Sequence, residues 1–173
     1  MISRRQLIAG LFVGAAALSC TEAPMPERKP GLWEEIHVSN FNSNVPVKVM
    51  HCVGSGAEHA LDHEMGDGYY GATCPPTTMT RKEGSLTLER RCKSDQHAIH
   101  GKATYKGDFD SSYEMSFFAR YAPPLEGGLE EVTGSIKARW IGPCEPGQRP
   151  GDFSADTGVK VNLPELRKTP VTQ

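Results

Sequence analysis

The chain has 173 residues, of which 38% are hydrophobic and 23% charged, and this length fits a single domain. Its 19 basic and 21 acidic side chains give a net charge of −2, so there is no basic excess with which to hold nucleic acid. After the first twenty residues no apolar run approaches the roughly 18 residues of a membrane-spanning helix. These features argue against a nucleic-acid-binding protein and exclude a protein with several membrane-spanning helices.

The N-terminus has the order of regions found in a secretory signal. Arg4 and Arg5 precede an uncharged apolar run at residues 7–18, and small residues then lead to Cys20. The paired arginines resemble a twin-arginine signal, but a signal for general secretion can also carry two arginines. We therefore expect an exported protein and leave the export route open.

The residues before Cys20 predict a lipid anchor. Residues 17–20, Ala-Leu-Ser-Cys, resemble a bacterial lipobox, in which the peptidase cuts before an acylated cysteine. We expect a signal peptide at residues 1–19 and an anchor and stiff, proline-containing tether at residues 20–30. Thr21 does not resemble an inner-membrane retention signal, so we expect a periplasm-facing lipoprotein of the outer membrane. The alternative is ordinary cleavage nearby, which would leave a soluble periplasmic protein.

Four cysteines remain beyond the anchor, and in an oxidising compartment they predict two disulfides. They are Cys52, Cys74, Cys92 and Cys144. Two strand-like runs, 77–82 and 85–91, flank a Glu83-Gly84 turn signal, so residues whose numbers sum to about 167 lie opposite each other. This places Cys74 beside Cys92 and leaves Cys52 to pair with Cys144. No two of these cysteines have the short spacing of a zinc site or a redox pair.

From residue 31 onward apolar and polar residues alternate with a period of two, which predicts β-strands. The pattern is clearest at residues 109–121, where Phe109, Tyr113, Met115, Phe117, Ala119 and Tyr121 share one parity. It recurs at residues 132–140 and, more weakly, at 33–39, 45–51 and 98–106. One helix-like stretch, residues 57–65, interrupts the strands.

About seven strands joined by short connections predict an all-β fold, a single curled antiparallel sheet or a small half-barrel or barrel, stapled by disulfides. We expect this domain to cover residues 31–145. Residues 146–173 are polar and rich in Pro and Gly, which predicts an extended C-terminal tail.

Two sequence motifs carry a resemblance to a known family. Lys29-Pro30-Gly31-Leu32-Trp33-Glu34 near the start and Arg139-Trp140-Ile141-Gly142-Pro143-Cys144 near the end, with the intervening cysteines, resemble the bacterial domain-of-unknown-function family 3617. The resemblance covers about residues 29–150. It implies an exported, cysteine-stapled, β-rich envelope protein and implies no reaction. From the residues themselves, we expect Trp33 and Trp140 to anchor the core.

One histidine pair could bind a metal ion. On a helix, His59 and His63 share a face at the spacing of the zinc hydrolase motif H-E-x-x-H. That motif requires a glutamate where Ala60 stands, so a hydrolase is rejected. Two interpretations of this segment remain: a weaker divalent-metal site at His59 and His63, or a solvated polar helix that binds no metal. His97 and His100 face opposite sides of a strand and cannot share an ion without a bulge.

No nucleophile motif and no phosphate loop is present, so we expect neither enzymatic activity nor a cofactor. The favoured hypothesis is a non-enzymatic envelope lipoprotein that binds a small apolar ligand or lipid. It is based on the aromatic and other apolar side chains at alternate positions of residues 109–121, which would share one face of a strand. The competing interpretation is that these alternating side chains simply fill the core. A second hypothesis is an accessory protein that docks an envelope partner through loop 53–70 and the tail.

Overall fold

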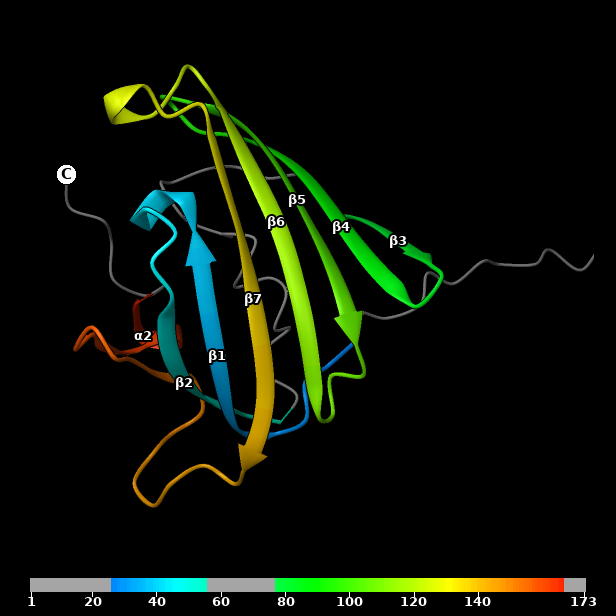
Figure 1. Cartoon of the computed structure of the whole chain (residues 1–173), viewed down its shortest axis with the longest axis vertical. Coiled ribbons are helices and arrows are strands. Elements are labelled where there is room, and N and C mark those ends of the chain that lie inside the picture. The colour runs from blue at the N-terminus through cyan, green and yellow to red at the C-terminus, as the bar shows by residue number, and fades with distance from the viewer. Residues whose placement is uncertain (1–25, 56–76, 167–173) are drawn as a thin grey trace, which may run out of the picture.

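The computed structural model describes residues 26–55 and 77–166. They form one strongly curved antiparallel sheet of nine strands in the order β3-β4-β5-β6-β7-β1-β2-β8-β9 (Figure 1). The order is linear, so in the described part of the chain β3 and β9 are edges and the sheet does not close into a barrel. The predicted all-β, curled-sheet fold is confirmed, with two more strands than expected.

The strands are long in the middle of the sheet and short at the β9 edge. Their bounds are β1 Gly31–Ser39, β2 Val47–Val53, β3 Thr78–Lys82, β4 Ser85–Lys93, β5 Ala98–Gly107, β6 Ser112–Ala122, β7 Glu131–Gly142, β8 Asp152–Ala155 and β9 Lys160–Asn162. Three one-turn helices complete the described elements: η1 Asn40–Asn42, η3 Glu126–Gly128 and α2 Leu163–Leu166. Among these, no helix is long and apolar enough to cross a membrane.

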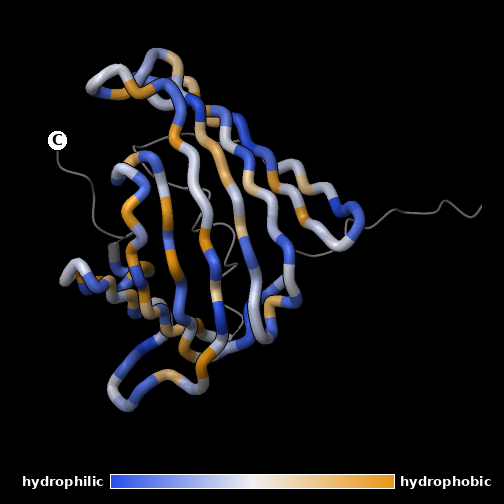
Figure 2. The backbone as a smooth tube through the Cα atoms, viewed as in Figure 1, coloured by the Kyte–Doolittle hydropathy of each residue, from blue (hydrophilic) through white to orange (hydrophobic). Residues whose placement is uncertain are grey.

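Hydrophobic and hydrophilic residues alternate along several strands (Figure 2), and this alternation gives the sheet a buried inner face and a more polar outer face. The inner face carries the core. Trp33 and Tyr105 are completely buried there. The other buried core members are Val53, Leu86, Leu88, Ala103, Phe109, Tyr113, Met115, Ile136 and Ala138.

The register of the β3–β4 hairpin confirms the pairing predicted around Glu83-Gly84. Thr78 faces Glu89 and Lys82 faces Ser85, and both pairs of residue numbers sum to 167. The turn itself places Glu83 and Gly84 at positive φ, the conformation that short hairpin turns require.

The strand predicted over residues 109–121 begins later than its alternation indicates. β6 starts at Ser112, and Phe109 lies in the preceding turn at φ 60°. Asp108 organises this turn, because its carboxylate accepts the backbone N–H groups of Asp110 and Ser111. Phe109 nevertheless is buried in the core, so its apolar character reflects burial from a turn.

The C-terminal segment departs from the predicted extended tail. Residues 152–155 form β8, which pairs with β2, and residues 160–162 form β9. Gly151 N donates to Cys52 O, and the ring of Phe153 packs edge-on against His51. The segment therefore extends the sheet by pairing with the edge strand β2. A strand of four residues is too short for this long-range pairing to be predicted from the sequence.

Candidate functional site

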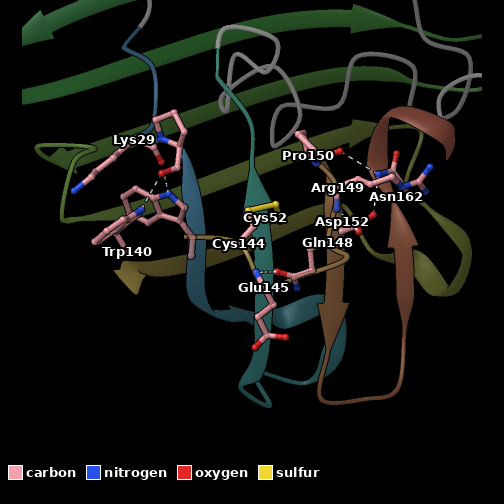
Figure 3. Close-up of a disulfide and its surroundings, with 12 residues drawn as sticks. Lys29, Cys52, Trp140, Cys144, Glu145, Gln148, Arg149, Pro150, Asp152 and Asn162 are labelled. Atoms are coloured by element: carbon pink, nitrogen blue, oxygen red, sulfur yellow. Dashed lines mark hydrogen bonds between the residues drawn. A yellow bond between two sulfur atoms is a disulfide. The ribbon is translucent and has the colours of Figure 1, made fainter. Parts of the chain in front are cut away.

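The two sequence motifs meet at the end of the sheet where β1 begins and β7 ends, drawn as the lower end of Figure 1. Trp33 lies opposite Trp140 across the β1–β7 pair. Trp140 Nε1 donates to Pro30 O, and the Lys29 ammonium lies 3.6 Å above the Trp140 ring (Figure 3). Trp33 is a core anchor as predicted, whereas Trp140 is only partly buried and holds the motif at the rim.

The predicted Cys52–Cys144 disulfide is present on the opposite side of this end (Figure 3). It joins β2 to the segment after β7, with Cα atoms 5.4 Å apart and 92 residues between the cysteines in sequence. Cys92 is also disulfide-bonded, and Cys74, its expected partner, lies outside the described residues.

The segment before β1 crosses the lower end of the inner face and closes it. Lys29 N donates to Phe109 O in the β5–β6 turn, and Trp33 Nε1 donates to Lys29 O. Arg28 turns its side chain inward, where it is almost completely buried. The segment thus links β1 with the turn that precedes β6.

Arg28 is part of a buried polar cluster that also contains Glu35 of β1, His51 of β2 and Tyr113 of β6. Its Nη1 donates to Glu35 Oε1 at 2.6 Å and to the Tyr113 hydroxyl at 3.2 Å. Its Nη2 lies 3.2 Å from His51 Nδ1. His37, about a third exposed, places Nε2 2.7 Å from Glu35 Oε2. Side chains from three strands and the entering segment therefore meet at one buried ion pair, Arg28–Glu35.

The electrostatics of this cluster keep Glu35 ionised. Burial raises the pKa of the carboxyl, but the hydrogen bond from His37 and the positive charge of Arg28 outweigh burial and hold the pKa of Glu35 well below its usual range. A buried ion pair of this kind depends on both partners, since either charge alone in the core would be strongly unfavourable. Loss of either partner should therefore destabilise the closed end of the inner face.

The other end of the inner face is less covered. Along β6, Tyr113 and Met115 are 2% and 3% exposed, whereas Phe117, Ala119 and Tyr121 are only partly buried. Ile99 of β5 and Val132 of β7 flank them and are also partly buried. An apolar surface therefore continues from the core toward the upper end of the sheet.

The remaining predicted site residues are not tested by the described part of the chain. Cys20 and the histidine pair His59 and His63 lie outside it, as does the predicted helix at 57–65. Within residues 26–55 and 77–166, no group of three or more His, Cys, Asp or Glu could hold a metal ion. His97 lies just before β5 and contacts Pro123 O, whereas His100 of β5 contacts Glu89, so no contact joins the two histidines to one site in the described residues.

The buried cluster was not predicted from the sequence. Glu35 and His37 share the parity of Trp33 on β1, so alternation alone places two polar side chains on the apolar face. That mismatch is the available signal, because a carboxylate on a buried face requires partners. Arg28 offered no such signal, since it precedes the strand.

The part of the chain that matches a known protein family corresponds to the central strands and the buried cluster described above. The family model described as Protein of unknown function (DUF3617) matches residues 28–144. The chain belongs to the DUF3617 family. The match begins at Arg28 of the buried cluster and ends at Cys144 of the disulfide, so it covers β1–β7, and β8 and β9 lie beyond it. No curated protein and no solved structure matches the chain.

Proposed function

We propose that this DUF3617 protein is an exported lipoprotein, anchored through Cys20, that binds a small apolar ligand or lipid chain without transforming it. The Cys52–Cys144 bridge supports export, because structural disulfides persist in oxidising compartments. The lipobox-like residues 17–20 support the anchor, and Thr21 favours the outer membrane.

The ligand lies against the inner face near the upper end of the sheet. The observation that carries this proposal is the change in burial along β6, from the nearly inaccessible Tyr113 and Met115 to the partly exposed Phe117, Ala119 and Tyr121. The hypothesis from the sequence assigned all the alternating apolar residues of 109–121 to a ligand-binding surface. Complete burial of the lower members assigns them to the core and leaves the upper members for binding.

The composition of this surface suits an acyl chain or a similar apolar group. Ala119 and Gly101 are small residues paired across β5 and β6, with Phe117, Tyr121 and Ile99 beside them on the same face, and the buried Arg90 of β4 faces Gly101 from the other side. Apolar pockets with a few polar groups are the usual sites for such ligands. Burial of a chain against these side chains removes apolar surface from water, at about 25 cal/mol for each Å².

Binding of the fluorescent fatty acid cis-parinaric acid to the mature, disulfide-bonded chain tests this proposal. Ala119→Trp fills the surface from the inner face and should weaken binding by about ten-fold or more. Ser116→Trp places the same side chain on the outer face of the same strand and should leave binding unchanged. Thermal unfolding of both variants checks that each is folded. Absence of saturable binding by the wild-type chain, or equal binding by the two variants, would contradict the proposal.

A further inference from the structure

The outer face of β1–β7 is basic, although the chain as a whole has a net charge of −2. Nine basic and four acidic side chains occupy it, giving five net positive charges. The basic residues are Lys48, Lys82, Arg91, Lys93, Lys102, Lys106, Arg120, Lys137 and Arg139, and the acidic residues are Glu34, Glu89, Glu114 and Glu131. The fold thus separates positive charge onto one surface.

The excess is concentrated on β3, β4 and β5. Ion pairs with Glu34, Glu114 and Glu131 engage the basic side chains of β2, β6 and β7. The outer face of β3–β5, which we call the basic patch, carries Lys82, Arg91, Lys93, Lys102 and Lys106. Its one acid, Glu89, contacts Arg91 and His100. Among the described residues, none forms an ion pair with any of the four lysines of the patch.

Hydroxyl groups lie between these charges. Thr80, Thr87 and Thr104 form one cross-strand row on β3, β4 and β5. This row is flanked on one side by the row of Lys82 and Lys106 and on the other by that of Glu89 and Lys102. Hydroxyls and ammonium groups together donate hydrogen bonds to phosphate oxygens. Acidic groups border the patch: Glu83 in the β3–β4 turn and Glu114, which faces Lys106 but pairs with Lys137.

The described chain enters at the lower end of the sheet, on the inner face and close to the end of β5 that carries Lys106. Lys29 is hydrogen-bonded to Phe109, three residues beyond Lys106, and Figure 1 draws the entering segment beside the end of β5. Cys20 precedes Pro26 by six residues, which span at most about 20 Å. An acylated Cys20 would therefore keep the lower end of the sheet, which carries Lys82 and Lys106 of the patch, close to the bilayer surface.

We infer that the basic patch docks the protein face-on against the anionic phospholipid headgroups of a membrane. The inference adds an orientation to the proposed lipoprotein and does not depend on the apolar ligand. Charge complementarity carries it: juxtamembrane Lys and Arg side chains are each attracted to an anionic bilayer, and salt screens this attraction. The inner face, on the other side of the sheet, then points away from the headgroups.

Co-sedimentation of the mature chain with vesicles tests the inference, with Cys20→Ser used to exclude the lipid anchor. The chain should bind vesicles of phosphatidylglycerol and phosphatidylcholine at low salt, bind pure phosphatidylcholine weakly, and be released by salt. Charge reversal at Lys82, Lys102 and Lys106 should reduce partitioning by about ten-fold or more. Lys160→Glu on β9, outside the basic patch, should change it less than about two-fold.

Equal binding to both vesicle types, no binding to the anionic vesicles, or full binding by the charge-reversed chain would overturn the inference. Circular dichroism melts of each variant establish that the sheet is intact. Binding of cis-parinaric acid by the charge-reversed chain separates the two proposals, because it should persist when membrane docking is lost.

Discussion

Replacement of Glu35 by Gln should destabilise the protein more than any neighbouring charge change. The variant keeps the shape of the side chain but leaves Arg28, whose side chain is 1% exposed, without its buried counter-charge. Breaking a buried pair from one side costs about 3–5 kcal/mol. Because Gln retains one neutral acceptor for Arg28, we expect the lower end, about 3 kcal/mol at pH 7.

The pH dependence of this loss follows from the lowered pKa of Glu35. Its ionised form stabilises the folded state above the ordinary carboxyl pKa of 4.5, and the contribution disappears as pH falls through the lower folded-state value. The difference between wild-type and Glu35→Gln unfolding free energies should therefore be constant near neutral pH and shrink in acid.

Urea unfolding monitored by circular dichroism between pH 3 and 7 measures both effects. Glu34→Gln is the matched control, because Glu34 lies next in sequence on the outer face and pairs with the exposed side chains of Lys48 and Arg139. It should cause a much smaller loss. A loss below about 1 kcal/mol for Glu35→Gln, or one equal at all pH values, would refute the assigned role of the cluster.

Two further predictions concern the lower end of the sheet. Replacing Cys52 and Cys144 by Ala should lower the unfolding free energy by roughly 4–5 kcal/mol, as expected for a loop of this length, and reduction of the wild type, which also breaks the disulfide of Cys92, should lower it by at least as much. Gly31→Ala should destabilise by at least about 2 kcal/mol, since φ is +134° and a Cβ would meet Trp140 at 2.5 Å. Gly84→Ala, also at positive φ but with open space around it, should cost about 1 kcal/mol; equal losses at the two glycines would contradict the steric argument.

Local sequence patterns predicted much of the sheet, because its central strands have one buried and one exposed face. The β3–β4 register followed from the Glu83-Gly84 turn, and the Cys52–Cys144 pairing followed from that register by elimination. These features depend on short-range geometry, which spacing in the sequence reports directly.

Features that depend on long-range contacts were not predictable in the same way. β8 forms because the β2 edge accepts it, and its four residues carry too little alternation to show this. Arg28 reaches Tyr113 across 85 residues of sequence. The inner-face residues of β6 likewise divide into buried and partly exposed residues. This division depends on how the rest of the chain covers the inner face, which cannot be predicted from the alternation of apolar residues.

Native mass spectrometry of the mature protein, purified from its own cell envelope, tests the central proposal most directly. We expect an added apolar mass that is lost on unfolding, absent from Ala119→Trp and retained by Ser116→Trp. A wild-type chain that carries only its disulfides and its covalent anchor, with no mass lost on unfolding, would contradict a ligand-binding role for the inner face.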